Sequence, residues 1–87
     1  SQCNSASIYW TNDNPATNNT AANNLCGAGS PRTVYFNGTN LGNSTQVYSA
    51  SGCGSLASGT KYYSQDNSNY YIWNGSSLSG PYNLNCP

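Results

Sequence analysis

The stretch that decides the fold runs from residue 69 to residue 75 and reads NYYIWNG. Aromatic and β-branched residues followed directly by an Asn-Gly pair are the strongest short-range signal for a strand that enters a hairpin turn. The same order recurs at residues 33–38, which read TVYFNG. A leucine follows each pair, Leu41 in one copy and Leu78 in the other. We expect each leucine to fold back onto the aromatic side chain that precedes the turn.

Further strands are expected on both sides of these two hairpins. Residues 7–11, 45–49, 61–64 and 82–84 are rich in β-forming residues. One helix is expected between Asn14, a suitable N-cap that precedes a proline, and Gly27, a suitable C-terminal glycine. The sequence therefore predicts a mainly β fold of the small α+β type. It has two Asn-Gly hairpins and one short helix, stapled by two disulfides.

The disulfides are inferred from four cysteines, Cys3, Cys26, Cys53 and Cys86, in a chain of 87 residues without histidine. So many cysteines in a small chain indicate an oxidising compartment. A structural zinc site is the alternative, but its cysteines usually come in pairs about two to four residues apart, and the gaps here are longer. Of the three connectivities we expect Cys3–Cys26 and Cys53–Cys86, because each bond then ties a local unit. The first would join the first strand to the helix, and the second would join the hairpins.

The chain carries very little charge. Asp13, Arg32, Lys61 and Asp66 are its only charged residues and make up 5% of the chain, against about 25% in an average domain. A neutral surface cannot bind phosphates by counterion release, so we expect no nucleic-acid partner. It is not attracted to anionic lipid, and no apolar run is long enough to span a bilayer, so we expect no direct membrane insertion. Weak repulsion between copies permits self-association.

Several short motifs lie in the last two thirds of the chain. They are TVY at residues 33–35, VYS at 47–49, CG at 53–54, ASGTKYYS at 57–64, the Asn-Gly turns and the closing Cys86. With these motifs, residues 33–87 resemble short Cys-closed β modules of bacteriophage tail-fibre and virion-surface proteins and of repeat-bearing bacterial surface proteins. The resemblance implies a structural or adhesive exterior module and brings no catalytic residue with it.

Residues suited to catalysis are scarce. Acid–base chemistry needs titratable groups close together, and the only carboxylates are Asp13 and Asp66. They could form a glycosidase pair or bind calcium with nearby Asn oxygens, but both lie in Asn-rich stretches that are typical of turns. No histidine is present to activate a serine, which leaves a Ser–Lys dyad with Lys61. We therefore expect a non-enzymatic protein with no catalytic residues, no cofactor and no bound metal.

Aromatic residues exceed what so small a core needs, since the chain has eight Tyr, two Trp and one Phe. The match between the two hairpins assigns Trp73 to the core like Phe36, with Tyr70 on the opposite face of its strand. A tyrosine ring on the surface beside amides suits a sugar ring, although cross-strand pairing alone would also explain each tyrosine. The residues that we expect to contact a ligand are Trp10, Tyr63, Asp66, Tyr70 and Tyr71.

These features predict a single extracellular, disulfide-stabilised module over residues 1–87, which we interpret as a mature or excised piece because it begins at Ser1. The expected function is attachment of a virion or cell-surface appendage to a glycan or other component of a host or cell surface. The alternative is a self-assembling subunit of an extracellular filament, coat or decoration layer, whose partners are copies of itself, because the strands carry few charges to guard their edges. A small hydrolase and an ice-binding protein are weaker alternatives.

Overall fold

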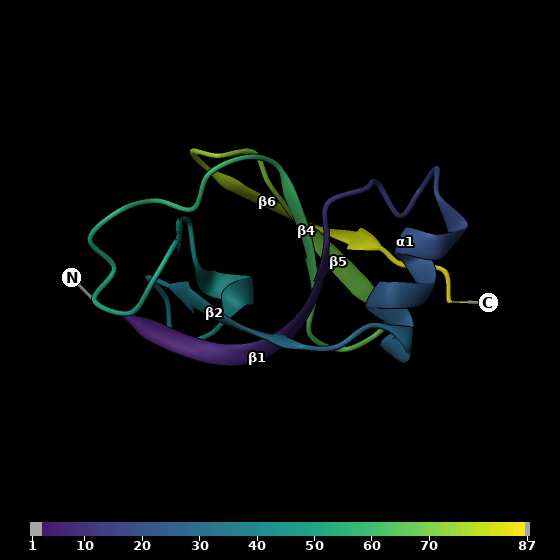
Figure 1. Ribbon diagram of the computed structural model, residues 1–87, viewed down its shortest axis with the longest axis horizontal. Coiled ribbons are helices and arrows are strands. Elements are labelled where there is room, and N and C mark those ends of the chain that lie inside the picture. The colour runs from purple at the N-terminus through teal and green to yellow at the C-terminus, as the bar shows by residue number, and fades with distance from the viewer. Residues whose placement is uncertain (1–2, 87) are drawn as a thin grey trace.

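A computed structural model describes residues 3–86 and contains one curled, antiparallel sheet with the strand order β3-β2-β1-β4-β5-β6 (Figure 1). The strands are β1 (Asn4–Thr11), β2 (Arg32–Phe36), β3 (Val47–Tyr48), β4 (Lys61–Ser64), β5 (Asn69–Trp73) and β6 (Leu78–Asn83). The helical segments are α1 (Asn19–Asn23), the π-helical turn η1 (Asn24–Ala28) and the 3-10 turn η2 (Leu41–Asn43). The predicted class is confirmed, since the fold is mainly β, with one short α-helix and two disulfides. Two of its hairpins, β2–β3 and β5–β6, follow an Asn-Gly pair, and a third joins β4 to β5.

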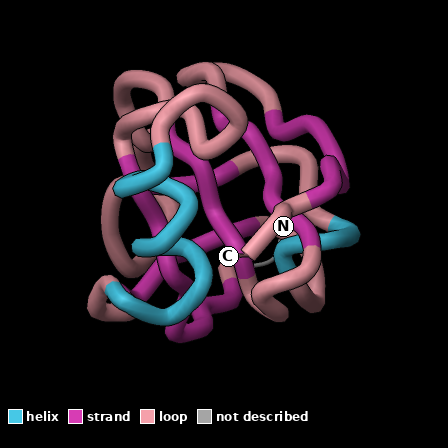
Figure 2. The backbone as a smooth tube through the Cα atoms, turned by 90° about the vertical axis from the view of Figure 1, so that its right-hand side faces the viewer, coloured by secondary structure: helices cyan, strands magenta, loops and turns pink. Residues whose placement is uncertain are grey.

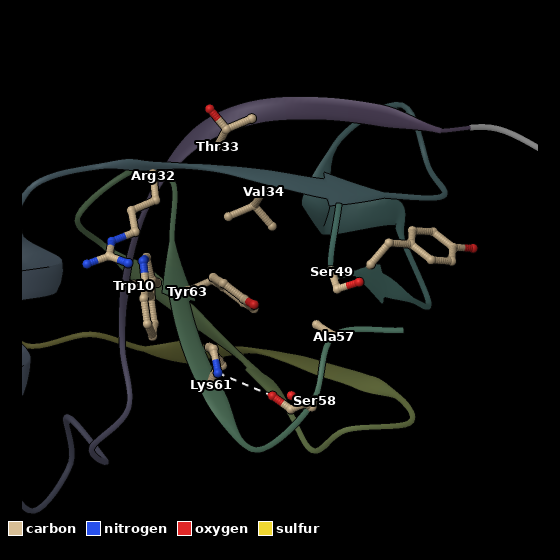
Figure 3. A pocket seen from close by; sticks show the side chains of 10 residues that line it. Trp10, Arg32, Thr33, Val34, Ser49, Ala57, Ser58, Lys61 and Tyr63 are labelled. Atoms are coloured by element: carbon tan, nitrogen blue, oxygen red, sulfur yellow. Dashed lines mark hydrogen bonds between the residues drawn. The ribbon is translucent and has the colours of Figure 1, made fainter. Parts of the chain in front are cut away.

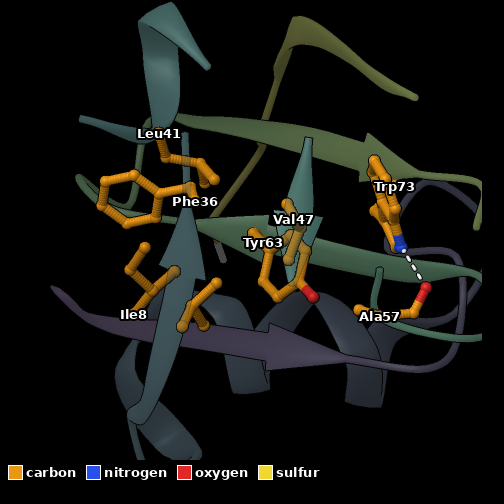
Figure 4. Close-up of a cluster of buried hydrophobic side chains, with 8 residues drawn as sticks. Ile8, Phe36, Leu41, Val47, Ala57, Tyr63 and Trp73 are labelled. Carbon is orange, nitrogen blue, oxygen red and sulfur yellow. Dashed lines mark hydrogen bonds between the residues drawn. The ribbon is translucent and has the colours of Figure 1, made fainter. Parts of the chain in front are cut away.

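Strand β1 is the centre of the sheet because it pairs with a different neighbour along each half. Its residues Asn4 to Ile8 pair with β2, whereas Tyr9 to Thr11 pair with β4. The sheet curls, and one face, which we call the inner face, packs against itself (Figure 4). The buried side chains of this inner core are Ile8, Val34, Phe36, Leu41, Val47, Ala57, Tyr63 and Trp73.

The outer face of the sheet is covered in part by the helical segment. Leu25 of η1 packs with Tyr70 of β5 and with Leu84, which follows β6, in a second buried cluster. Figure 2 shows the helical segment alongside the strands. Strand β5 is therefore buried on both faces, with Trp73 in the inner core and Tyr70 beneath the helical segment. The hairpin comparison predicts the burial of Trp73 and the opposite orientation of Tyr70, but not the burial of Tyr70.

The hairpin between β5 and β6 turns at residues 74–77. The side-chain oxygen of Asn74 accepts hydrogen bonds from the backbone N–H groups of Ser76 and Ser77, which is the local bonding that makes asparagine a turn residue. Leu78 then pairs in register with Trp73 and packs against the inner core. The second Asn-Gly pair thus ends its strand at the predicted place.

The first Asn-Gly pair opens a longer connection, over residues 37–46, between β2 and β3. The side-chain oxygen of Asn37 accepts hydrogen bonds from the backbone N–H groups of Thr45 and Gln46 and so closes the base of this loop. Within the loop Leu41 is completely buried beside Phe36 in the inner core (Figure 4). Both leucines therefore pack where the two matching sequences predict.

The α-helix begins later than expected. Asn14 does not cap it; its side chain accepts a hydrogen bond from the backbone N–H of Ala16 in a preceding turn. The N-cap is Asn18, whose side chain accepts from Ala21. Several asparagines in this segment can hydrogen-bond to the backbone. Asn18 is the one that caps the helix, and the helix that follows it buries the alanines of α1. Gly27 has a φ of 113° and, as predicted, lies where the regular helical path ends.

The expected disulfide pairing is wrong: the bonds are not Cys3–Cys26 and Cys53–Cys86 but Cys3–Cys53 and Cys26–Cys86. Strand β1 separates Cys3 from the helical segment, because eight strand residues span about 26 Å at about 3.3 Å each. The start of β1 and α1 accordingly lie at opposite ends of the molecule (Figure 1), and no local unit contains both cysteines.

The observed partners follow from the strand register. Strand β3 pairs with β2 at Phe36, and Phe36 pairs with Asn4, so the loop that leaves β3 passes the start of β1 and brings Cys53 to Cys3. At the other end Leu84 packs on Leu25, which places the last cysteine beside the one in η1. The sequence separations are 50 and 60 residues, each worth about 4 kcal/mol in the chain-entropy account. The two bonds indicate an oxidising, extracellular setting.

The four charged residues allow a direct test of this pairing. Trypsin cleaves after the only two basic residues and an aspartate-specific protease cleaves before the only two acidic ones, which together place each cysteine on its own peptide. Mass spectrometry without reduction should find the Cys3 peptide bonded to the Cys53 peptide, and the Cys26 peptide bonded to the Cys86 peptide. A Cys3 peptide bonded to either other peptide would contradict the fold. A reduced digest provides the control.

Candidate functional site

Three of the residues predicted to contact a ligand form a row on the inner face of the sheet. Trp10 of β1 pairs in register with Tyr63 of β4, and Tyr63 pairs with Tyr71 of β5. Residues directly opposite each other on antiparallel strands point to the same face. Tyr63 is only 3% exposed, whereas Trp10 and Tyr71 are partly buried against the inner core. The sheet thus brings together residues that are far apart in the sequence.

Trp10 and Tyr63 line an open cleft of about 260 Å³, which we call the Trp10 cleft (Figure 3). Its apolar lining consists of Trp10, Val34, Ala57 and Tyr63. Its polar lining consists of Arg32, Thr33, Tyr48, Ser49, Ser58 and Lys61. The cleft is therefore formed by strands β1 to β4 together with the loop that connects β3 to β4.

Both basic residues of the chain lie on the ring of Trp10. The guanidinium carbon of Arg32 is 4.7 Å from the ring centroid, and the ammonium nitrogen of Lys61 is 5.2 Å from it. Both distances are within the range in which the negative face of an indole attracts a cation. Lys61 is also fixed by a hydrogen bond of 3.2 Å to the backbone carbonyl of Ser58 (Figure 3). Trp10 therefore organises all of the positive side-chain charge in the protein at one place.

Neither cation has a carboxylate partner in the part of the chain that the structure describes. Arg32 contacts the Trp10 ring, and Lys61 contacts the ring and one backbone carbonyl, with no ion pair for either. The Trp10 cleft is thus an electropositive site on a protein whose net charge is zero.

The hydroxyl of Tyr63 is a polar group without a partner at the wall of this cleft. Among residues 3–86 it makes no hydrogen bond, although the side chain is only 3% exposed. All fully enclosed side-chain polar atoms in the same residues have partners, so the Tyr63 oxygen still opens into the cleft, as Figure 3 shows. Burial raises the pKa of Tyr63 to about 12. The phenol is therefore protonated at neutral pH and can donate a hydrogen bond.

The structure does not bring Asp66 and Tyr70 to the cleft lining. Asp66 is exposed in the turn between β4 and β5, where its carboxylate accepts hydrogen bonds from the backbone N–H groups of Ser68 and Asn69. These two bonds lower the pKa of Asp66. Tyr70 is 8% exposed in the outer-face cluster, where its ring packs against that of Tyr82 at a centroid distance of 5.5 Å. Both side chains thus have structural roles.

A second, more polar hollow of about 370 Å³ lies next to the Trp10 cleft and shares two of its residues. Trp10 and Arg32 line both hollows, and Asp13 lines only the second. Asp13 and Arg32 form no ion pair within the described residues. Trp10 and Arg32 therefore form the wall between this polar hollow and the Trp10 cleft.

Sequence reasoning missed Arg32, Tyr48, Ser49 and Ser58 as parts of the site, and it considered Lys61 only as part of a Ser–Lys dyad. Their positions depend on the register of β1 with β4 and on the path of the loop after β3. The one signal available in the sequence was the scarcity of cations, since the chain has only two. Nothing in the sequence, however, places both at Trp10.

The burial of Tyr63 predicts a pH dependence of stability. A phenol whose pKa is about 12 in the folded protein and about 10 in the unfolded chain stabilises the fold fully below pH 10. This contribution is lost as the pH rises from about 10 to 12 and amounts to about 2–3 kcal/mol. Urea unfolding across this range should show the fall in wild type, and Tyr63→Phe should remove it. Tyr82→Phe, at an exposed tyrosine, is the matched control; an equal fall in wild type and Tyr63→Phe would contradict the assignment.

No helix among the described residues is long and apolar enough to cross a membrane. Residues 3–86 also bring no three His, Cys, Asp or Glu side chains together as metal ligands. Comparisons with protein-family models, curated proteins and solved structures found no match to this chain. The functional proposal for this protein is therefore based on the Trp10 cleft itself.

Proposed function

We propose that this protein is a non-catalytic exterior module of a virion or cell-surface appendage and attaches to a glycan through the Trp10 cleft. The disulfide pair supports an extracellular setting. The observation that carries the proposal is the Tyr63 hydroxyl, which is nearly buried, has no partner among residues 3–86 and opens into the cleft. Buried polar groups are normally hydrogen-bonded, so a ligand that bonds this hydroxyl gains an interaction that the protein alone leaves unmade.

The remaining lining of the cleft also suits a sugar. Ser49, Ser58 and Tyr48 add hydroxyl groups to the wall, while Val34 and Ala57 add apolar surface. Sugar rings present both hydroxyls and C–H faces, and binding pockets combine apolar walls with a few convergent polar groups. The volume of about 260 Å³ is below the range of about 300–1,000 Å³ for drug-sized ligands. The cleft therefore suits a single ring, such as the terminal residue of a glycan.

The placement of titratable groups favours binding over catalysis. A general acid or base must be close to the reacting group and have a pKa near the working pH. Asp66 is held ionised by two backbone N–H groups, and Asp13 lines the neighbouring hollow rather than the cleft. Tyr63 keeps its proton far above neutral pH.

The sheet edges give less support to self-assembly, the alternative function. An exposed edge strand with free backbone groups is a template for pairing with another copy. Edge strand β3 has only two residues, and edge strand β6 contains Pro81 and a register shift in its pairing with β5. Short strands, prolines and bulges are the features that block such pairing. The scarcity of charge is thus compensated at both edges by backbone features.

A glycan array tests the proposed function. The label should be attached through a terminal tag, because the only lysine of the chain lines the cleft. We expect wild type to bind a subset of glycans and Trp10→Ala to lose at least about tenfold in affinity, since the cleft loses a wall and the support of its cations. Tyr82→Ala, on the outer face, should bind like wild type.

Two results would contradict this function. The first is an array without any bound glycan, and the second is equal binding by wild type and Trp10→Ala. Light scattering over a range of protein concentrations should accompany the array. Ordered assemblies that grow with concentration would favour the structural subunit over the attachment module.

A further inference from the structure

We propose that Asn74 is a self-modifying site, at which the side-chain amide cyclises onto Gly75 and becomes a carboxylate, while the fold protects Asn37 from the same reaction. The chain has two Asn-Gly pairs, at residues 37–38 and 74–75. Glycine obstructs this reaction least, because it has no side chain to shield its backbone nitrogen. The two pairs therefore have the same local chemistry, and the structure decides between them. The modification does not depend on what the Trp10 cleft binds.

The reaction needs only the two residues and water. The backbone nitrogen of Gly75 attacks the side-chain amide carbon of Asn74, and a new C–N bond forms as the bond to the amide NH2 group breaks. The proton of the Gly75 N–H leaves with this group as ammonia, and the product is a five-membered succinimide. Water then adds to one of the two ring carbonyls and opens the ring to aspartate or isoaspartate.

The side-chain carbonyl of Asn74 is activated for this attack. Its oxygen accepts hydrogen bonds from the backbone N–H groups of Ser76 at 2.9 Å and Ser77 at 2.8 Å, and from the Ser76 hydroxyl at 3.1 Å. Negative charge develops on this oxygen during the attack, and donors that are already in place stabilise it, as in an oxyanion hole. The same bonds hold the side chain over the backbone that follows it, so the reacting groups stay close.

The attacking and leaving groups of this pair are free of hydrogen bonds. The Gly75 N–H and the side-chain NH2 of Asn74 make none among residues 3–86. Asn74 is exposed, and a Cβ added to Gly75 would meet nothing closer than the Gly59 backbone at 3.9 Å. The Gly75 peptide can therefore rotate to direct its nitrogen at the amide carbon, and ammonia can leave into solvent.

The first Asn-Gly pair has the opposite arrangement. The Gly38 N–H donates to the Ser44 hydroxyl at 2.9 Å, and the Gly38 carbonyl accepts from the Asn4 side chain at 2.6 Å. The amide nitrogen of Asn37 donates to the Thr45 hydroxyl at 2.9 Å. The side-chain oxygen of Asn37 also has two backbone donors, so the difference between the pairs lies in their nitrogen atoms. Attack at Asn37 therefore requires the loop to open locally.

The product changes the charge of the molecule. A carboxyl group with an ordinary pKa of about 4 is ionised at neutral pH, so each event adds one negative charge to a chain whose formal net charge is zero. Gly75 lies against Gly59 of the β3–β4 loop, which forms one wall of the Trp10 cleft. The new charge therefore arises on a turn that borders this wall.

The test follows both pairs in one sample. Intact, disulfide-bonded protein is incubated at mildly alkaline pH, then reduced and cut with trypsin, which places the two Asn-Gly pairs on separate peptides because it cleaves after Arg32 and Lys61. High-resolution mass spectrometry measures the modified fraction of each peptide over time, with an unincubated sample as the blank and Asn74→Asp as the standard for the aspartate product. We expect Asn74 to react at least about tenfold faster than Asn37, because the Gly38 peptide must first lose two hydrogen bonds.

Two controls separate the fold from the local sequence. In reduced protein unfolded in urea, the two pairs should react at similar rates, since each asparagine follows an aromatic residue and precedes a glycine. Ser44→Ala removes the acceptor of the Gly38 N–H and should speed the reaction at Asn37 several-fold while leaving Asn74 unchanged. Circular dichroism should show that this variant is folded.

The outcomes decide the proposal in either direction. Faster reaction at Asn74 in the folded protein, with the preference lost in urea, supports it. Equal rates at the two asparagines in the folded protein overturn it, as does an Asn74 that reacts only in urea. A preference for Asn74 that persists unchanged in urea overturns the assignment to the fold, and a folded Ser44→Ala variant without faster reaction at Asn37 overturns the role of the Gly38 hydrogen bond.

Discussion

The hydrogen bond from the indole of Trp73 to the backbone carbonyl of Ala57 connects the core of this protein to its candidate site. The bond is 3.0 Å long and buried, and the N–H of the same Ala57 donates to Val47 at 2.9 Å. Together the two bonds hold the β3–β4 loop against the inner face, where Ala57 and Ser58 form one wall of the Trp10 cleft. Loss of the Trp73 donor would leave the Ala57 carbonyl without a partner, at a cost of about 1–3 kcal/mol. The packing of Trp73 in the inner core therefore helps to hold this wall of the cleft in place.

The scarcity of charge has a structural counterpart in the asparagines. Asn37, Asn40, Asn43 and Asn74 accept backbone hydrogen bonds in the two hairpin connections, and Asp66 does the same between β4 and β5. Amide side chains thus perform the local work of shaping the loops, and the fold needs no salt bridge among its described residues. Neither cation is used in a salt bridge among the described residues, and both contact Trp10. On a protein with so few charges, this shared position is a stronger indication of a functional site than it would be on a highly charged protein.

Local features of the sequence predicted the local features of the structure. The strand at residues 69–73, the Asn74 turn, the burial of Trp73 and the opposite orientation of Tyr70 all follow from short-range patterns. The disulfide pairing and the cleft did not, because both depend on which distant strands pair. Cys53 reaches Cys3 through the register of β1, β2 and β3, and Trp10 meets Lys61 only because β4 joins the far half of β1.

The most direct measurement of the central claim, that the Trp10 cleft is the binding site, is amide and indole chemical-shift mapping by NMR with a saturating concentration of a glycan that binds on the array. The chain has two indole N–H signals, one for each tryptophan, so the ring in the cleft can be observed separately from the buried one. The account predicts that the Trp10 indole shifts together with amides of Thr33 and Ser58. Shifts confined to the outer face around Tyr82, with the Trp10 indole unchanged, would contradict it.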